Sequence, residues 1–510
     1  MTTLLRESNL YRLWLTLRRT CGESAVHRML SSAGRWLREQ FHASLLLNAA
    51  CREGAVARSW ETSVLCRILT VVLNLPASLL HRLYLAFRPL FDESRFASFA
   101  FEVGEETAIA QSWMILLLWM IPFSHWNNLY NLLGFAMLLA LFCLRGMRDP
   151  RARLDVKTVG FYPVLLFGGV CLAVPLSAYP SLSGRFLLYH AVCALCLLIT
   201  VSAVRNAEDL KRLAASAGAA VAVSSAYGVY QRIQGVEVNP SYVDTTVNEG
   251  MPGRVESLFD NPNTFAEVLI LLLPLVVALV LTSRHWFPRL LACGVFILGS
   301  AALGMTYSRA SWIGIAVAAA VFVFLWKPAL FPAFVLLGLL CVPLLPSTIW
   351  HRILTITNTS DSSTASRIPL YEAALAVIRR SPLSGAGLGT AAVQQYIADN
   401  NLYHAEAPFV HAHNIYLEVW IEAGLLGFVS FCASMLWNIK NAARQVRRCA
   451  DSTARTITAA CAASLCGAMV AGLADYLWNY PRVMSIFWFV FAMALAGVKI
   501  CRSTAENVRH

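Results

Sequence analysis

Long apolar segments constrain this chain more than any other feature of its sequence. About twelve follow one another between residues 108 and 500, each with the roughly 18–22 residues that a helix needs to cross a bilayer. Their bounds are 108–124, 127–144, 158–177, 186–203, 213–230, 264–282, 289–306, 310–326, 329–345, 414–437, 456–474 and 483–500. With 57% hydrophobic and 14% charged residues, the chain is too apolar for a soluble protein. The sequence therefore predicts an all-α polytopic membrane protein of about twelve transmembrane helices, with a large outer loop between spans 9 and 10.

The loops between these segments alternate in charge. Every second loop is basic, and all five lysines of the chain fall in this set. The basic residues are Arg145, Arg148, Arg151, Arg153, Lys157, Arg205, Lys211, Arg212, Arg284, Arg289, Lys327, Lys440, Arg444, Arg447, Arg448, Arg455, Lys499, Arg502 and Arg509. Because basic loops are retained in the cytoplasm, we expect both termini there and the long loops 231–263 and 346–412 outside. The net charge of +12 is then mostly this surplus and says little about a polyanionic partner.

The first 107 residues differ in composition from the rest of the chain. They contain 13 arginines and 10 acidic residues, with basic amphipathic stretches at 11–19 and 35–46 and an apolar run at 65–80. We expect this segment to lie on the cytoplasmic membrane surface, attracted to anionic lipid, because its apolar run is short and bracketed by arginines. The basic residues are dispersed, so we expect no nucleic-acid partner. The predicted division is 1–107 for this segment, 108–500 for the membrane domain and 501–510 for a cytoplasmic tail.

Neither the cysteines nor the histidines indicate a disulfide framework or a metal site. The 14 cysteines lie almost entirely in predicted spans or on the cytoplasmic side, so we expect no disulfide framework. Cys193 and Cys196 have CxxC spacing, but they lie inside an apolar segment, where helix packing explains them. His404, His411 and His413 lack the cysteines or carboxylates that would complete a ligand set, and we expect no metal.

The stretch from His411 to Glu422 is the most informative motif. It places His413, Asn414, Glu418 and Glu422 at the start of a long apolar helix. Ionisable groups at the entrance to a membrane span are costly and by default mark a functional site. Histidine is also the side chain best suited to accept a proton near neutral pH. The alternative is that His413 and Asn414 only cap the helix in the headgroup layer.

Arginines are rare on the predicted outer face. About nine occur there, against roughly 32 Lys and Arg elsewhere in the chain. Arg254 and Arg309 lie at the ends of outer loops, next to apolar segments. A guanidinium group matches the oxygens of a phosphate, so such arginines are candidates for holding an anionic group. The alternative is that they extend to lipid phosphates at the membrane surface.

These motifs resemble the O-antigen ligase and polymerase superfamily of bacterial membrane glycosyltransferases. His413 and Asn414, with Gly424 after nine further residues, match the ligase signature of His, then Asn, Ser or Gln, nine residues and Gly. Three other stretches agree with the family in order and predicted side: Arg254 with Phe259 and Asn261-Pro262-Asn263; Ser308-Arg309-Ala310-Ser311-Trp312; and Ser366-Arg367 with the loop 382–389. The resemblance covers roughly residues 110–500 and implies a GT-C-like fold. The long N-terminal segment departs from the family and leaves the acceptor open.

The resemblance implies an inverting glycosyltransferase that needs no metal, nucleotide sugar or other cofactor. It would transfer a glycan from a polyprenyl (undecaprenyl) diphosphate to a hydroxyl of a glycan, lipid or cell-wall acceptor, on the outer face of the bacterial cytoplasmic membrane. His413 would be the catalytic base, and Arg309, Arg254 and Arg367 would bind the diphosphate. Supporting roles would fall to three further residues, Asn414, Glu422 and Asp475.

Three alternatives remain open at the level of sequence. A chain polymerase of the same superfamily shares this architecture, and the sequence separates it poorly from a ligase. A transporter or flippase for lipid-linked glycans would be expected to have ionisable groups near the midplane, whereas these cluster at the outer ends of spans. A structural scaffold for envelope assembly would not need an outer histidine among arginines.

Overall fold

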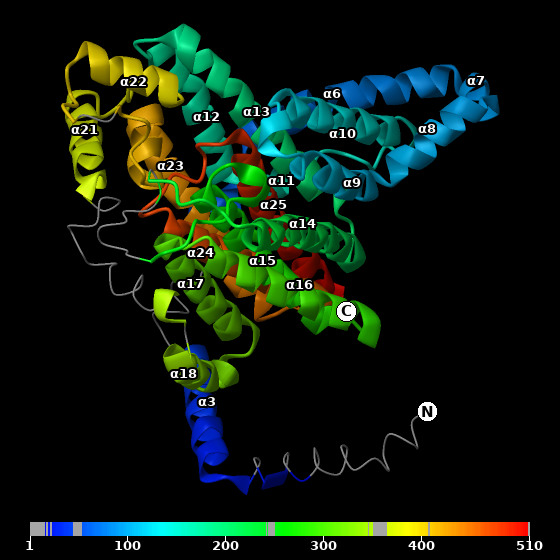
Figure 1. The fold of residues 1–510 in the computed structure, drawn as a ribbon. Helices are drawn as coiled ribbons and strands as arrows, with labels where there is room; N and C mark the ends of the chain where they lie inside the picture. Colours follow the sequence, from blue (N-terminus) through cyan, green and yellow to red (C-terminus); the bar gives the residue numbers. More distant parts are fainter. Residues whose placement is uncertain are drawn as a thin grey trace.

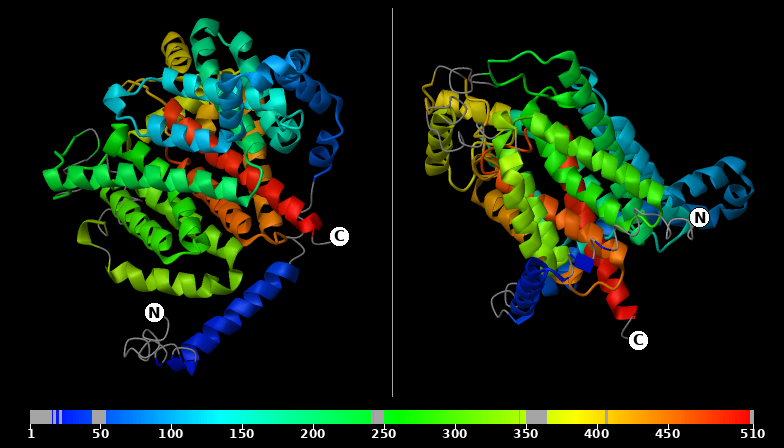
Figure 2. Two further views of the ribbon diagram at one scale, coloured as in Figure 1. Left: turned by 90° about the vertical axis from the view of Figure 1, so that its right-hand side faces the viewer. Right: turned by 60° about the horizontal axis from the view of Figure 1, so that its bottom comes forward.

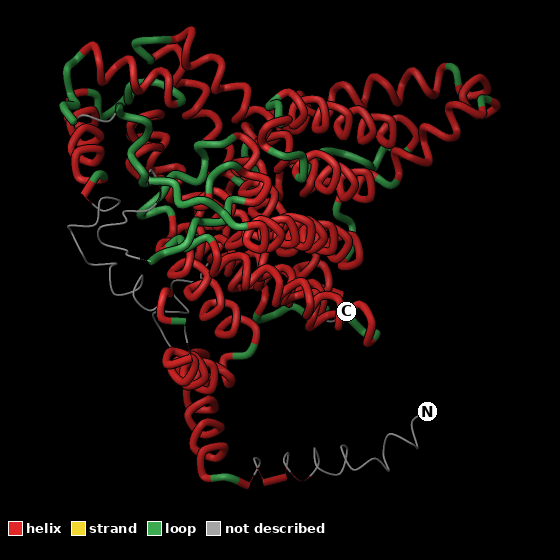
Figure 3. The backbone as a smooth tube through the Cα atoms, viewed as in Figure 1, coloured by secondary structure: helices red, strands yellow, loops and turns green. Residues whose placement is uncertain are grey.

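The structure is a computed structural model that describes residues 16, 19–20, 23–43, 54–240, 242, 250–344, 346–349, 365–405 and 408–507. Within these residues all regular secondary structure is helical and no strand occurs (Figure 3). Most of the predicted amphipathic stretch 11–19, the end of the stretch 35–46, and parts of the loops 231–263 and 346–412 lie outside the described residues. The prediction of an all-α polytopic membrane protein is confirmed.

Ten described helices are long and apolar enough to cross a membrane. They are α6 (Val64–Ala86), α10 (Leu129–Arg148), α13 (Pro180–Ala203), α14 (Ala207–Gln234), α15 (Pro262–Thr282), α16 (Trp286–Met305), α17 (Arg309–Trp326), α23 (Ile415–Val446), α24 (Ser452–Ala471) and α25 (Pro481–Asn507). Nine of them correspond to predicted spans, and α6 is the tenth.

The other three predicted spans are shorter helices, so the structure differs from the expected count of about twelve. They are α9 (Thr107–Trp119), α12 (Phe161–Leu176) and α18 (Phe331–Cys341). Proline or glycine residues near one end limit the length of each of these helices. Pro122 follows α9, α12 begins after Gly160 with its φ of 85°, and α18 passes into a 3₁₀ turn that contains Pro343.

The remaining helices are shorter or less apolar than these. They are α3 (Ala25–Ala43), α5 (Ala55–Trp60), α7 (Arg88–Glu93), α8 (Arg95–Glu105), α11 (Val156–Val159), α21 (Arg367–Arg380) and α22 (Thr390–Asp399), with 3₁₀ turns η1 (Phe123–His125), η2 (Ser257–Phe259), η3 (Pro328–Leu330) and η4 (Val342–Leu344). Helices α21 and α22 lie at one end of the bundle, and α7 and α8 project at the other (Figure 1).

The core of the bundle is formed by α15, α24 and α25, which are mostly buried, whereas most residues of α6, α16 and α17 are at least partly exposed. Helix α25 runs through the middle of the other helices (Figure 2). Small residues let α17 approach α24, since a Cβ on Gly467 would lie 2.5 Å from the carbonyl oxygen of Gly314. The buried helices fix where the loops at both ends meet.

The basic loops gather at one end of the bundle, which we call the basic end. Ion pairs join them across helices: Arg145 with Glu105 at 3.4 Å, and Lys499 with Asp155 at 3.6 Å. The opposite end, which carries α21, α22 and the histidine motif, we call the outer end. The structure therefore confirms which loops lie together, while the side of the membrane that each end faces stays a prediction.

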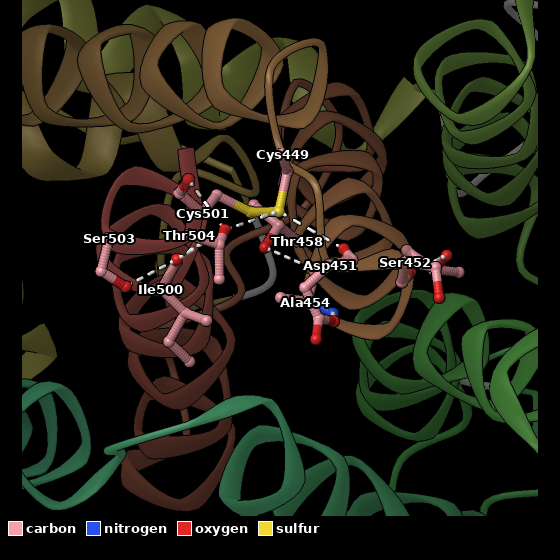
Figure 4. Close-up of a disulfide and its surroundings, with 10 residues drawn as sticks. Cys449, Asp451, Ser452, Ala454, Thr458, Ile500, Cys501, Ser503 and Thr504 are labelled. Atoms are coloured by element: carbon pink, nitrogen blue, oxygen red, sulfur yellow. Dashed lines mark hydrogen bonds between the residues drawn. A yellow bond between two sulfur atoms is a disulfide. The ribbon is translucent and has the colours of Figure 1, made fainter. Parts of the chain in front are cut away.

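A disulfide at the basic end corrects the expectation that the chain has none. Cys449, just after α23, is bonded to Cys501 in α25, with their Cα atoms 4.6 Å apart (Figure 4). The two residues are 52 positions apart in sequence. Their pairing was missed because helix packing, and not the distribution of cysteines between loops, brings them together.

The N-terminal segment packs on the basic end through α6. Asn74 donates to the carbonyl oxygen of Leu154 at 3.2 Å and accepts from its N–H at 2.7 Å. Much of the rest of α6 is exposed and apolar, including Val71 and Leu79. By length and composition α6 could cross a membrane, and it packs against α10 as well as against the loop that follows α10. Its placement on the membrane surface stays a prediction.

Candidate functional site

Helix α23, which follows the histidine motif, is bent at Gly424. This residue has φ 64° and ψ −169°, a conformation that residues with a Cβ rarely adopt. A Cβ there would also lie 2.0 Å from the carbonyl oxygen of Leu383. The bend receives the glycine-rich loop 382–389, whose Ala386 donates its N–H to the carbonyl oxygen of Ile421 at 2.6 Å. The glycine of the signature thus allows this loop to dock beside the histidine motif.

His413 lies immediately before α23 and faces Asp475 from the loop between α24 and α25. Its Nδ1 is 3.2 Å from a carboxylate oxygen of Asp475, and 31% of its side chain is exposed. A carboxylate at Nδ1 favours the tautomer that carries its proton there, which leaves Nε2 as an acceptor. The pair can therefore bind a proton at Nε2 from a group outside the protein.

Asp475 is held as an anion by its surroundings. Burial alone would raise the pKa of this carboxyl, but the hydrogen bond from His413 and the electrostatic influence of His413 and Arg367 lower it overall. Asp475 also accepts the N–H of Tyr476 at 3.0 Å. A fixed negative charge at this position can orient the imidazole and stabilise its protonated form.

His411 is a neighbour of His413 but has a different environment. The two rings are 4.0 Å apart between centroids, yet only 6% of His411 is exposed. Burial, and then the charges of His413 and Arg367, lower the pKa of His411 to about 3, although Asp475 opposes the shift. Its Nδ1 accepts the backbone N–H of His413 at 3.2 Å. His411 is thus a neutral packing residue at neutral pH, and His404 is exposed and outside this group.

Asn414 is the N-cap of α23, as the alternative reading of the motif predicted. Its Oδ1 accepts the N–H groups of Tyr416 and Leu417 at 2.9 and 3.1 Å. Its Nδ2 donates to the carbonyl oxygen of Leu473 at 2.9 Å. The cap therefore joins the start of α23 to the loop that carries Asp475. The capping interpretation holds for Asn414, whereas His413 is directed to a carboxylate.

Two buried carboxylates of α23 are hydrogen-bonded to the segments that carry His413 and Asp475. Glu418 accepts the N–H of Ala412 at 2.6 Å, and Glu422 accepts the hydroxyl of Tyr476 at 3.1 Å. Both side chains are almost inaccessible to solvent. Glu422, which was expected to have a supporting role, is thus bonded to the loop that carries Asp475. Glu418 and Tyr476 were not among the candidates, although Glu418 is bonded to the loop that carries the histidines. The spacing of Glu418 and Glu422, four residues apart on one helix face, was a signal for the pair.

Arg254 is buried and bonded to protein groups. Its Nε donates to the carbonyl oxygen of Thr306 at 2.7 Å, its Nη1 donates to that of Tyr242 at 3.2 Å, and its Nη2 donates to the side chain of Asn263. Asn261 caps α15 by accepting the N–H groups of Asn263 and Thr264. The Asn-Pro-Asn motif and Arg254 thus tie the start of α15 to the turn that precedes α17.

The three predicted diphosphate ligands occupy two places. Arg309 is the first residue of α17 and is partly exposed, three residues after the carbonyl group that Arg254 binds. Arg367 is the first residue of α21, and its charge lowers the pKa of both His411 and Asp475. Arg254 and Arg309 therefore share one turn, while Arg367 lies on the side of the histidines.

The same backbone strain recurs at three helix starts of the outer end. Asp260, Tyr307 and His413 have φ values of 56°, 52° and 44°, in the left-handed region that residues with a Cβ seldom occupy. Each precedes the N-cap residue of α15, α17 or α23. Strained residues of this kind gather at functional sites, because surrounding contacts must hold them there. The strained residues lie in the motifs at 254–263, 307–312 and 411–414, which makes each of these segments a candidate for function.

An aromatic pocket of about 410 Å³ opens beside these motifs at the outer end. Trp126, Tyr189 and Tyr480 line it together with Asn128 and Asn479. Asn128 accepts from the indole of Trp126 at 3.0 Å and donates to the hydroxyl of Tyr189 at 3.1 Å. The sequence analysis did not single out this pocket, because its residues come from four separate short segments.

Tyr480 connects the pocket to the site. Burial first, and then the charges of Tyr242, Asp260, Glu267 and Asp475, raise its pKa. Those residues belong to the loop before α15, the first turns of α15 and the loop before α25. Tyr480 therefore lies within electrostatic range of Asp475 and of Tyr242, whose carbonyl oxygen binds Arg254.

An apolar groove of about 730 Å³ lies between α15, α16, α17 and α18. Leu273, Phe296 and Phe322 form much of its wall, and its lining extends to Gly304 and Trp312, which flank the turn of Arg309. The groove can hold a long apolar chain whose polar end reaches that turn. Within the described part of the chain, no group of three or more His, Cys, Asp or Glu side chains is arranged to hold a metal ion.

Residues 294–432 match the family model described as O-antigen ligase. The matched region runs from α16 into α23 and contains Arg309, Arg367 and His413. This match confirms the resemblance that the motifs had indicated. No curated protein matches the chain.

Proposed function

Because the chain carries an O-antigen ligase domain in a multi-pass membrane fold, we propose that it transfers a glycan from polyprenyl (undecaprenyl) diphosphate to an acceptor hydroxyl at its outer end. The observation that carries the proposal is the His413–Asp475 pair, at 3.2 Å, beside strained helix starts that bear arginines. The site would face the outside of the bacterial cytoplasmic membrane, with both termini in the cytoplasm.

His413 acts as the base in this proposal. The acceptor hydroxyl gives its proton to Nε2 as its oxygen forms a bond to the anomeric carbon. The bond between that carbon and the diphosphate breaks, and its electron pair leaves with the diphosphate. A single displacement inverts the anomeric centre. Asp475 stabilises the imidazolium that forms, as its hydrogen bond to Nδ1 supports.

Positive charge stabilises the departing diphosphate. Arg309 lies at the N-terminus of α17, where the helix dipole and free N–H groups also favour an anion. In this proposal Arg367 contacts the diphosphate from the side of the histidines, and Arg254 lies on the side of the turn that precedes α17. Since Arg254 already binds three protein acceptors, its main contribution is to hold the turn of Arg309 in place while adding charge.

The two cavities fit the two parts of such a donor. The apolar groove beneath the turn of Arg309 suits a polyprenyl tail, because its lining is almost wholly apolar. The aromatic pocket suits a saccharide, because aromatic faces pack on sugar rings while amide and hydroxyl groups bind sugar hydroxyls. These fits favour a transferase with a lipid-linked glycan over a scaffold.

The test is reconstitution of the purified full chain in liposomes with an undecaprenyl-diphosphate oligosaccharide and candidate acceptors. Release of free diphosphate carrier together with a glycosylated acceptor would support transfer. One block on a foreign acceptor identifies a ligase, whereas a ladder of products identifies a polymerase. Loss of donor from the outer leaflet without product would instead identify a flippase.

A further inference from the structure

A separate cavity opens at the basic end, at the opposite ends of the helices from the histidine site. It has a volume of about 550 Å³ and lies between α14, α15, α16 and the start of α24. Its rim is polar and includes Lys211 and Glu208 on α14, and Arg284 and His285 in the turn between α15 and α16. The rim thus offers two cationic side chains at the level where a bilayer has its headgroups.

The depth of the cavity is apolar and narrow. Gly218, Ala219 and Ala222 form one wall along α14, and Val276 and Val295 form the opposite wall. Because the residues of α14 are small, the neighbouring helices leave a channel there that larger side chains would fill. The cavity therefore combines a charged mouth with an apolar channel directed along the helices.

The basic residues of this rim differ from neighbouring arginines in their ion pairing. Arg205 and Arg212 are paired with Asp209 at 3.3 and 3.5 Å. Within the described part of the chain, Lys211 and Arg284 form no such pair, although both line the cavity. Their charges remain for a ligand. The rim also holds the carboxylate of Glu208, which can accept a hydrogen bond from a ligand hydroxyl.

We propose that this cavity binds an anionic glycerophospholipid from the leaflet at the basic end. Its phosphate lies against Lys211 and Arg284, a headgroup hydroxyl donates to Glu208, and one acyl chain follows the channel beside Ala219 and Ala222. An amphiphile with one negative charge matches both halves of the cavity, whereas a soluble anion leaves the channel empty. Basic pockets between spans on the cytoplasmic side recognise anionic lipid headgroups in the same way.

The experiment measures lipid binding by the detergent-purified, delipidated full chain. Phosphatidylglycerol and phosphatidylcholine are added separately, and bound lipid is counted by native mass spectrometry. We expect phosphatidylglycerol to bind at one retained site and phosphatidylcholine to bind weakly. Lys211→Gln combined with Arg284→Gln should weaken phosphatidylglycerol binding by roughly five- to thirtyfold, since each basic residue near an anionic lipid contributes independently.

Two further variants test whether lipid binding depends on this cavity. Arg151→Gln combined with Arg448→Gln removes the same charge from exposed positions of the basic end and should leave binding unchanged. Ala219→Phe fills the channel without altering the rim and should also displace the lipid. The proposal is overturned if both lipids bind equally, if the control loses as much lipid as the Lys211 and Arg284 variant, or if millimolar inorganic phosphate displaces the lipid. Size-exclusion profiles identify variants that do not fold.

Discussion

The two ends of this bundle use charged residues differently. At the basic end most ion pairs are partly exposed, as between Arg205, with 36% of its side chain accessible, and Glu105 at 40%, and the buried carboxylate of Asp209 is paired with Arg205 and Arg212. At the outer end, by contrast, Glu418 and Glu422 are buried almost completely and hydrogen-bonded to groups from other segments. Similar residue types therefore do different work at the two ends.

The difference between exposed ion pairs and buried carboxylates can be expressed as free energies. Exposed pairs contribute about 0–1 kcal/mol, so the surplus at the basic end serves mainly to orient the chain in the membrane. Burying a carboxylate costs several kcal/mol unless hydrogen bonds compensate. A protein that holds buried acids with neutral hydrogen-bond donors, beside a histidine and strained turns, bears that cost for a local function. Substitutions should therefore affect activity at the outer end and not at the basic end.

The largest effect is expected at His413. His413→Ala should reduce transfer in the liposome assay by about 10²–10⁴-fold, because general-base catalysis typically contributes that much. Donor binding should persist, since the arginines remain. His404→Ala, at an exposed histidine of the same loop, is the matched control and should transfer normally. Full activity in a folded His413→Gln protein would remove His413 from the role of base.

The second largest effect on transfer is expected for substitutions of Arg309. Arg309→Lys keeps the charge at the start of α17 but loses the two-pronged geometry that matches phosphate oxygens. Transfer should fall by about 10²-fold, as when a donor that stabilises developing charge is removed. The initial rate at saturating donor measures this effect. Near-normal transfer by Arg309→Ala, with intact expression, would mean that the diphosphate binds elsewhere.

Asp475→Asn should have a smaller effect than loss of His413. The amide retains the shape of the side chain but not the negative charge that holds the imidazole and stabilises its protonated form. We expect roughly a 10–10²-fold loss, the range found for groups that orient a functional histidine. Near-normal transfer by a folded Asp475→Asn protein would restrict Asp475 to a packing role.

The basic end provides the contrasting case. Glu105→Gln breaks contacts with Arg145 and Arg205 at 3.4 and 3.9 Å, yet these groups are partly solvated. Transfer should stay within about twofold of wild type, and stability should change by no more than about 1 kcal/mol. Thermal unfolding and the liposome assay measure both. A loss comparable to that of Asp475→Asn would end the distinction between the two ends.

The smallest effect concerns stability at acid pH. The pKa of His411 is about 3 in the folded protein and about 6.5 when the residue is exposed in the unfolded chain. Protonation therefore favours unfolding, and the stability that neutral His411 contributes is lost as pH falls from about 6.5 towards 3. His411→Asn can still accept the N–H of His413 but does not titrate. The melting temperature of wild type should fall more between pH 7 and pH 5 than that of the variant; equal falls would contradict this.

Sequence alone determined the fold class, the division of the loops into two groups and the order of the motifs. Spanning length and loop charge are properties of contiguous residues, so they can be read without knowing how helices pack. The signature from His413 to Gly424 is also contiguous. The role of Gly424 in this signature could not be predicted from contiguous residues, because the bend at Gly424 has a function only when the loop 382–389 lies against it.

The tertiary structure decided the pairings and the cavities. His413 meets Asp475 across 62 positions, Arg254 meets Thr306 across 52, and Cys449 meets Cys501 across another 52. Such contacts depend on which helix faces touch, and apolar segments of similar composition do not encode that choice locally. The same packing bonds Arg254 to other parts of the protein and leaves a cavity along α14. Burial, hydrogen-bond partners and empty volume exist only once all the helices are in place.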